Sequence, residues 1–360
     1  ETGHGDLSAE ILVLDAIAKR LRKKRFENGS MEFDRPEVKF DIAPDGHPVG
    51  VYFKVSKDAN KLVEEFMLLA NRTVAESVGH PVGRKKPKAF VYRVHDQPDQ
   101  TKLSDLANLA RTFGYKIKTT GTPREINKSI NRMLAEVKGR AEENLLSVLA
   151  VRAMAKAVYD THNIGHYGLG FEYYTHFTSP IRRYPDMMVH RLLARYMDGG
   201  RSVNEAKLED QCKHSSNMEQ LAATAERSSI KYKQVEYMAD HLGEEFTGVV
   251  SGVTEWGLYV ELDENLCEGL IPVRDLADDF YDFDERNFCL VGRRNNVRYR
   301  LGDNVKVRVA RTNLEKRQLD FVLVEDRGAS RPLSVAQVLH DAPAKHGCKS
   351  RRKSGGRSRK

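Results

Sequence analysis

The sequence predicts an α+β fold in which a mostly helical part is followed by a small all-β barrel and a basic, disordered tail. Before residue 242, apolar residues recur at helical spacing in several segments, whereas from Glu244 to Glu325 short segments alternate apolar and polar residues. From Lys345 to Lys360 there are eight Lys or Arg residues and no Asp or Glu. We therefore divide the 360 residues into the ranges 1–242, 244–325 and 326–360.

The composition narrows the class of protein. Hydrophobic residues make up 40% of the chain, which is enough for packed cores. No apolar run approaches the roughly 20 residues of a membrane span. The formal net charge is +8, and the eight cations of the tail account for all of it. A tail of this kind is typical of proteins that contact RNA or ribosome surfaces, with a plain solubilising tail as the alternative.

The cysteines and the first residue indicate a cytoplasmic protein of which this chain is a part. The chain begins with Glu1, without a secretory signal, so we expect a fragment or a processed piece of a longer protein. No pair of cysteines has the spacing of a zinc site or a redox motif, and reduced thiols are expected at Cys212, Cys267, Cys289 and Cys348.

The helical part divides into a hairpin and a series of helices. An Asp45-Gly46 turn predicts two strands within Val38–Val55. Helical periodicity predicts helices at Leu12–Phe26, Asp58–Ser77, Asp105–Phe113, Pro123–Val137 and Glu142–Tyr159. A last segment, Val203–Leu242, predicts two helices that are interrupted near Ser215 and Ser216.

The second part predicts five short strands. They are expected at 246–253, 256–262, 269–273, 305–309 and 319–323. Five strands in this length are typical of a closed barrel of the OB type. Alternation places Tyr259 on the polar face of its strand, and the opposite, apolar face is expected to carry Trp256, Leu258, Val260 and Leu262.

The stretch from Tyr173 to Arg191 (YYTHFTSPIRRYPDMMVHR) combines a polar turn, two arginines and the start of a helix. Pro180 disfavours helix for the residue before it, and Pro185 is suited to the first turn of the next helix. Arg182 is therefore expected on a rigid turn, pointing away from the helix, where a guanidinium can bind phosphate with two hydrogen bonds. From spacing alone, arginines paired with structural carboxylates are an equally good interpretation.

This stretch resembles the signature near the end of the catalytic domain of the RNB family, the ribonuclease II and ribonuclease R exoribonucleases. The preceding residues 150–170 (AVRAMAKAVYDTHNIGHYGLG) are similar to the segment that leads into the signature in bacterial ribonuclease R. The resemblance covers most of the chain. It implies a processive, hydrolytic 3′-to-5′ exoribonuclease that acts on single-stranded RNA and releases nucleoside 5′-monophosphates; action on structured RNA stays open.

The resemblance also implies roles for individual residues. It makes Arg182 catalytic and Glu226 a second catalytic residue at the same end of the RNA channel, although Glu226 alone is equally compatible with a surface ion pair. It places Glu65 of VEEFMLLAN near the RNA, with the adjacent Glu64 as the alternative. Further RNA contacts are expected within the signature at His176, Arg183 and Tyr184.

The second part closely resembles the S1 RNA-binding domain, in GVVSGVTEWGLYVEL and in YRLGDNVKVRV. Such a barrel binds single strands by stacking bases on exposed aromatic rings. Tyr259 is the best candidate, with Lys306 and Arg308 along the phosphates. Weaker stacking candidates are Phe246 and either Phe280 or Tyr281. A core position is the alternative for these rings, and it has more weight for Phe246 and Trp256 than for Tyr259.

Enzymes of this family resemble two-metal hydrolases, in which clustered aspartates hold Mg²⁺. One acidic run occurs in the second part, but its spacing fits neither an EF-hand nor a two-metal cluster, and we interpret it as a solvated loop: Asp275, Asp278, Asp279, Asp282 and Asp284. We assign no metal ligand to this chain and expect the Mg²⁺ ligands upstream of it. The chain should then bind RNA without degrading it.

A different class of function competes with this interpretation. A non-catalytic RNA-binding or ribosome-associated protein would use only the barrel and the tail, and a relative without its catalytic aspartates is a third possibility. In each case we expect single-stranded RNA as the partner, with the ribosome as a further partner through the tail. We expect a monomer in the cytoplasm without a membrane partner.

Overall fold

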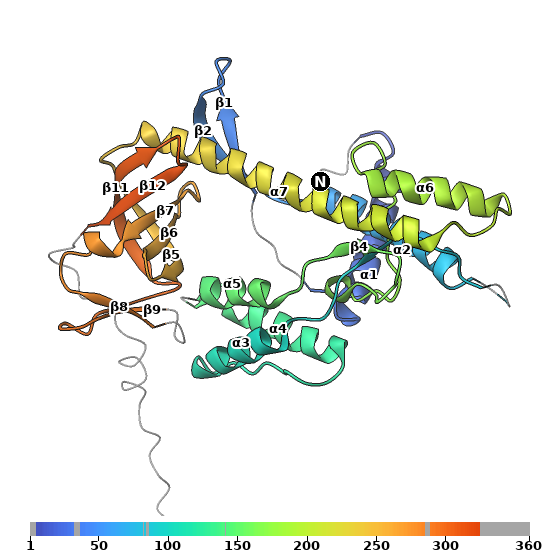
Figure 1. The fold of residues 1–360 in the computed structure, drawn as a ribbon, viewed down its shortest axis with the longest axis horizontal. Coiled ribbons are helices and arrows are strands. Elements are labelled where there is room, and N and C mark those ends of the chain that lie inside the picture. Colours follow the sequence, from blue (N-terminus) through green and yellow to red (C-terminus); the bar gives the residue numbers. More distant parts are fainter. Residues whose placement is uncertain are drawn as a thin grey trace, which may run out of the picture.

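A computed structural model describes residues 5–31, 37–81, 83, 86–140, 142–284 and 289–324 of the chain. A long helix, α7 (Glu205–Ala239), connects a mostly helical region to a β-barrel at the opposite end of the molecule (Figure 1). This arrangement confirms the predicted fold class. The tail expected at residues 326–360 lies outside the described residues.

Six helices precede α7 within the described residues: α1 (Ser8–Glu27), α2 (Asp58–Gly79), α3 (Gln100–Thr112), α4 (Pro123–Val137), α5 (Glu143–Ala153) and α6 (Tyr184–Met197). Helices α2 to α6 pack around two hydrophobic clusters, and α1 lies against α2. In one cluster, α3, α4 and α5 bury Leu103, Ile130 and Leu146. In the other, α2 and α6 enclose Phe90 and Val189. Both clusters collect apolar residues at helical spacing, which is why the sequence predicted these helices.

Two short antiparallel pairs of strands accompany the helices. The predicted hairpin is present as β1 (Glu37–Ile42) and β2 (Pro48–Lys54). Its turn is fixed to the end of α7, because His47 Nε2 lies 2.7 Å from Asp240 Oδ2 and Lys233 Nζ donates to Gly46 O at 2.6 Å. A second pair, β3 (Tyr92–Val94) and β4 (Val158–Asp160), is followed by a short 3-10 helix, Tyr167–Leu169.

The predicted helix over 142–159 is wrong in its second half. Helix α5 ends at Ala153, and Met154 already has an extended backbone with φ −74° and ψ 142°. Residues 158–160 instead pair with β3. Local periodicity could not show this, because the partner strand lies more than 60 residues earlier in the chain.

The predicted interruption near Ser215 and Ser216 is also wrong, since α7 is continuous through both residues. Ser215 Oγ donates to Gln211 O at 2.8 Å, and Ser216 Oγ donates to Cys212 O at 3.0 Å. Hydroxyls bonded to the carbonyl four residues earlier satisfy their hydrogen bonds inside the helix. Serines therefore need not end a helix that tertiary packing holds in place.

The predicted five-stranded barrel is closed, in the order β11-β12-β7-β6-β5. Its strands are β5 (Glu245–Thr254), β6 (Gly257–Leu262), β7 (Glu268–Pro272), β11 (Asn304–Asn313) and β12 (Gln318–Leu323). Its core contains Leu258, Val260, Leu262, Ile271 and Phe321, all fully buried. The alternation of β6 is therefore as predicted from Leu258 onwards.

A three-stranded sheet is inserted between β7 and β11, after the short 3-10 helix η2 (Val273–Asp275). It has the order β10-β9-β8 and consists of β8 (Tyr281–Asp284), β9 (Cys289–Gly292) and β10 (Arg298–Arg300). These strands are not predicted by the sequence. Each spans only three or four residues, and two of the four in β8 are aspartates, which are depleted in strands.

The last turns of α7 are docked on the loop between β6 and β7. Lys231 Nζ donates to Glu268 O, and Gln234 Nε2 donates to Leu266 O at 3.1 Å. Burial lowers the pKa of Lys231, against the opposing effect of Glu268. Within the described ranges, no helix has the length and apolarity needed to cross a membrane.

We predict that Gly269→Ala destabilises the barrel by about 1–3 kcal/mol, because it overpacks the core. A Cβ at Gly269 would lie 2.5 Å from the ring of Phe321, which has no space to move in a closed barrel. Urea unfolding followed by circular dichroism measures the change. Gly50→Ala is the matched control, since its Cβ would meet Asp41 at an ordinary 3.5 Å. Equal midpoints for both variants would contradict the prediction.

Candidate functional site

The arginine motif forms a tight turn immediately before α6. The backbone N–H groups of Arg182 and Arg183 both donate to Ser179 O, at 3.3 and 3.0 Å. Helix α6 then begins at Tyr184 with Pro185 in its first turn. Residues 179–182 therefore form a turn directly before α6, where the sequence predicted one.

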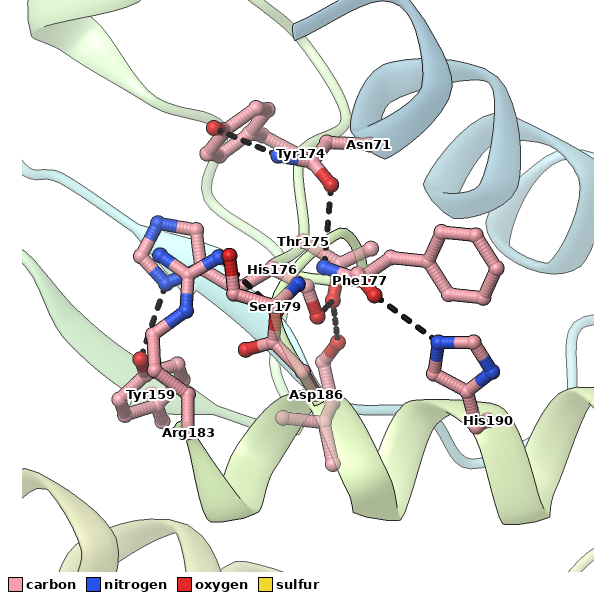
Figure 2. A network of polar contacts seen from close by, with 11 residues as sticks. Asn71, Tyr159, Tyr174, Thr175, His176, Phe177, Ser179, Arg183, Asp186 and His190 are labelled. Carbon is pink, nitrogen blue, oxygen red and sulfur yellow. Dashed lines mark hydrogen bonds and ion pairs between the residues drawn. The ribbon is translucent and has the colours of Figure 1, made fainter. Parts of the chain in front are cut away.

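A buried carboxylate fixes this turn. Asp186 is 0% exposed, and its Oδ2 accepts the backbone N–H of Ser179 at 2.8 Å and Arg183 Nη2 at 2.8 Å (Figure 2). The two donors stand on either side of the Pro180–Arg182 segment. Because a buried carboxylate is costly unless it is paired and hydrogen-bonded, these bonds hold the backbone of the turn in one conformation.

The two adjacent arginines have different environments. The side chain of Arg183 is only 22% exposed and forms the ion pair with Asp186. Arg182 is exposed, and its side chain forms no hydrogen bond or ion pair with any residue that the structure describes. Arg183 thus fits the alternative interpretation, in which the arginines pair with structural carboxylates. Arg182 does not, and its side chain is accessible to an external anion.

Side chains from α2 and α6 hold the strand-like segment before the turn (Figure 2). Asn71 of α2 donates to Tyr174 Oη at 3.1 Å and accepts the backbone N–H of Phe177 at 3.0 Å. His190 of α6 lies 2.9 Å from Phe177 O, and its ring stacks on Phe177 with a centroid distance of 4.1 Å. Asp186 and His190 are four residues apart and share one face of α6, and they bond to backbone groups of Ser179 and Phe177 respectively.

His176, a predicted RNA contact, is neutral in this site. Burial, then the nearby Arg183 and Arg93 guanidinium groups, lowers the pKa of His176 to about 2. Its Nδ1 lies 2.9 Å from Tyr159 Oη. The imidazole therefore carries no positive charge at neutral pH, and the predicted RNA contact stays a prediction.

An ion pair that the sequence does not indicate connects this region to α7. Arg93 donates to both carboxylate oxygens of Glu219, at 2.6 and 3.0 Å. Its guanidinium also lies 4.5 Å from the ring centroid of Tyr159. The two partners are 126 residues apart, so no local pattern could have indicated the pair.

Tyr184 and Glu226 are both accessible. Tyr184 is 56% exposed at the start of α6. Glu226 is exposed in the middle of α7, and no hydrogen bond or ion pair joins it to Arg182 among the described residues. Their predicted roles at the RNA channel stay predictions.

Glu65 is part of a buried ion pair between α1 and α2. It is 3% exposed, and its Oε1 accepts Arg25 Nη2 at 2.5 Å and Arg25 Nε at 3.1 Å. The adjacent Glu64 is 47% exposed and reaches Arg25 at 3.4 Å. Glu64 is thus the carboxylate that faces solvent, and an RNA contact at Glu65 stays a prediction.

The barrel places its aromatic residues differently from the sequence expectation. Tyr259 is half-buried in β6, while Phe246 and Tyr281 are buried. The core position expected for Trp256 is wrong, because this residue is 70% exposed. It lies in the turn between β5 and β6, before the alternation of β6 begins. Phe280 is 67% exposed.

The two predicted phosphate contacts of the barrel share a carboxylate. Lys306 and Arg308 on β11 pair with Glu245 of β5, at 3.0 and 2.6 Å. The two cations and the one carboxylate together carry a net charge of +1. The patch therefore attracts an anion less strongly than two unpaired cations would. Both cations remain partly exposed at 45% and 49%, and their predicted phosphate contacts stay predictions.

No group of His, Cys, Asp and Glu within the described residues is arranged to hold a metal ion. In the acidic run, the carboxylates bind protein donors instead. Asp279 accepts three backbone N–H groups, and Asp282 accepts Arg293 at 2.9 and 2.7 Å. The described residues therefore do not fit a two-magnesium centre.

Comparison with known families identifies both parts of the chain. The model of the RNB domain matches residues 2–199, which include the whole arginine motif. The chain belongs to the RNB family. The model of the S1 RNA-binding domain matches residues 240–323, the range of the barrel and its inserted sheet.

Curated RNB relatives carry the name ribonuclease R, which confirms the resemblance seen in the sequence. The protein of Aquifex aeolicus is 41% identical over 327 residues, which are 89% of this chain and 45% of that protein. The protein of Escherichia coli is 33% identical over 330 residues, which are 88% of this chain and 40% of that protein. This RNB chain thus spans less than half the length of either relative.

Solved RNB structures have the same fold. The apo form of Mycoplasma genitalium RNase R has a TM-score of 0.81 at 25% identity, over 90% of this chain and 51% of that one. The same enzyme in complex with ribose-methylated single-stranded RNA has a TM-score of 0.80. Yeast Ssd1, a pseudonuclease, has a TM-score of 0.58 at 22% identity over 80% of this chain and 36% of that one, a likeness of fold alone.

We predict that Asp186→Ala lowers the free energy of unfolding by about 3 kcal/mol, because it leaves Arg183 and the Ser179 N–H without their buried acceptor. Asp186→Asn keeps one acceptor oxygen and should lose less. Thermal and urea unfolding of the purified chain measure both variants. Asp198→Ala, an exposed aspartate just after α6, should stay within about 0.5 kcal/mol. An Asp186→Ala chain as stable as this control would show that the carboxylate does not fix the turn.

Proposed function

We propose that this chain forms the RNA-guiding part of an exoribonuclease of the ribonuclease R type, which removes nucleotides processively from the 3′ end of single-stranded RNA. The observation that carries this proposal is the exposed guanidinium of Arg182 on the turn that Asp186 fixes. Membership of the RNB family and the likeness to RNA-bound Mycoplasma genitalium RNase R support it.

Arg182 acts on the phosphate that is cleaved. A guanidinium has a planar set of donors that matches two phosphate oxygens, and it stays charged at every physiological pH. Because the fixed turn presents these donors before RNA arrives, little reorganisation is needed when negative charge develops on the phosphate. Arg183 contributes by positioning this turn rather than by contacting the reacting group.

The other predicted RNA contacts surround or extend this site. Neutral His176 and exposed Tyr184 offer rings and hydrogen bonds beside the turn, and Glu226 orients groups at the nucleotide end. In the barrel, Trp256 joins Tyr259 as a stacking residue because its ring is exposed. Stacking of a base on an aromatic ring contributes about 1–3 kcal/mol per base.

Magnesium is the cofactor of this proposal, and it would supply the activated water and the charge that the leaving oxygen requires. The described residues do not form its site. The roles assigned to this chain are therefore to bind, orient and stabilise the RNA backbone. The complete reaction depends on aspartates supplied by another part of an RNB domain.

A non-catalytic RNA-binding protein is the second candidate. The described residues hold a complete barrel with an exposed Trp256, which is sufficient for binding, and the pseudonuclease Ssd1 shares the fold. The coding sequence before Glu1 distinguishes the two. An in-frame aspartate cluster favours the enzyme, whereas a start codon or a segment without the cluster favours the binding protein.

We predict that the purified chain binds single-stranded RNA but releases no nucleotides when Mg²⁺ is added. Fluorescence anisotropy with a labelled oligonucleotide measures binding, and a denaturing gel measures degradation. Trp256→Ala should weaken binding by about 1–3 kcal/mol, since it removes one stacking ring. Release of mononucleotides that depends on magnesium would contradict the proposed division of roles.

We predict that Arg182→Ala lowers turnover about 100- to 1,000-fold in a polypeptide that joins this chain to an aspartate-bearing RNB segment. The loss in RNA affinity should be much smaller, because the guanidinium acts on charge that develops during cleavage. Single-turnover kinetics and binding titrations separate the two quantities. The matched control is Arg191→Ala, an exposed arginine on α6. Equal losses in turnover and affinity would reduce Arg182 to a binding role.

A further inference from the structure

The acidic run of the inserted sheet holds an arginine-bearing turn next to an exposed phenylalanine. Asp279 Oδ2 accepts the backbone N–H groups of Arg294 and Asn295, at 2.6 and 2.8 Å. Its Oδ1 accepts the N–H of Phe280 at 2.7 Å. In addition, the N–H of Arg293 donates to Phe280 O at 2.9 Å. One carboxylate and one backbone bond thus fix Phe280 and residues 293–295 as a single unit.

The neighbouring carboxylates strengthen the same unit. Asp278 accepts Tyr281 Oη at 2.8 Å and Asn295 Nδ2 at 2.9 Å. Asp282 forms two hydrogen bonds with the guanidinium of Arg293. These hydrogen bonds order the turn at residues 293–295. The ion pair with Asp282 also neutralises Arg293, whereas Arg294 is not part of an ion pair within the described residues.

Phe280 and Arg294 form the exposed surface of this unit. The ring of Phe280 is 67% exposed, although a phenylalanine usually enters a core when the fold provides one. The guanidinium of Arg294 lies 5.9 Å from the ring centroid. Within the described ranges, that side chain has no hydrogen bond or ion pair. An accessible ring and an available cation therefore lie side by side on a preorganised support.

We propose that Phe280 and Arg294 form a second contact site for single-stranded RNA, outside the barrel. A base stacks on the ring of Phe280, and the guanidinium of Arg294 contacts the adjacent phosphate. Aromatic rings next to cations are the general means of binding single strands without reading their sequence. This inference rests on the proposed function, because it adds a site to a chain that binds RNA.

The arrangement favours RNA over a protein partner. A protein interface centred on one phenylalanine would need surrounding apolar area. The sequence neighbour Tyr281 is buried, and the other residues next to Phe280 in the sequence and across the turn are Asp279, Arg293 and Arg294. A stacked base needs only the ring face, and a phosphate needs only the cation. A rigid support also lowers the entropy lost on binding.

Anisotropy titrations of the full chain with a labelled single-stranded oligonucleotide test the site. Phe280→Ala should weaken binding about five- to one-hundred-fold, as expected for the loss of one stacked base. Phe280→Tyr should retain the affinity. Arg294→Gln should reduce the slope of log affinity against log salt by about 0.7, the value for one phosphate contact on a single strand. Ile42→Ala, an exposed apolar residue of the β1–β2 hairpin, is the control and should bind normally.

A fluorescence experiment tests whether RNA contacts residue 280 directly. Trp256 is the only tryptophan of the chain, so Trp256→Phe combined with Phe280→Trp places the single indole in the proposed site. Quenching of this fluorescence on addition of RNA supports stacking at residue 280. RNA binding with unchanged fluorescence, together with normal affinity for Phe280→Ala, would overturn this inference and leave the proposed function intact. No RNA binding by the unaltered chain would overturn both.

Discussion

The arginine motif depends on one buried carboxylate. Asp186 has no exposed surface, so the cost of removing it from water must be offset by its two donors. These donors, the Ser179 N–H and the Arg183 guanidinium, stand on the two sides of a short segment that contains Arg182. The same interaction therefore fixes the backbone of the turn and neutralises one arginine. The neighbouring arginine keeps its charge and its exposure, which is what a phosphate contact requires.

Helix α7 contacts the region of this motif with its central turns and the barrel with its C-terminal turns. In its central part, Glu219 binds Arg93 and Ser216 Oγ accepts the backbone N–H of Tyr159. Towards its C-terminus, Lys231 and Gln234 donate to carbonyl groups of the barrel. With 35 residues, the helix is about 50 Å long. A continuous helix of this length keeps the arginine turn and the barrel in a fixed relation.

The sequence predicted the elements whose evidence is local. The Asp45-Gly46 hairpin, the periodic α4 and the alternating β6 required only residues that are close in the chain. Predictions failed where distant contacts decide. Ser216 lies in a continuous helix where a distant residue contacts it, since its hydroxyl accepts the backbone N–H of Tyr159, and residues 158–160 form a strand because β3 lies beside them. The environments of Arg182 and Arg183 differ because only Arg183 reaches Asp186. The sequence could not indicate this, since it shows only two identical, adjacent residues.

The acidic run shows that a cluster of carboxylates is a metal site only if its oxygens are not already accepting hydrogen bonds from protein donors. A Mg²⁺ site needs carboxylate oxygens that are free to coordinate, whereas Asp279 uses both oxygens to accept backbone N–H groups and Asp282 uses both for Arg293. A cation at this place would have to displace bonds that hold the turn at residues 293–295. The negative charge of the run is therefore used internally, and the surface that results carries the ring of Phe280 and the guanidinium of Arg294. An acidic sequence can in this way support a surface suited to an anionic ligand.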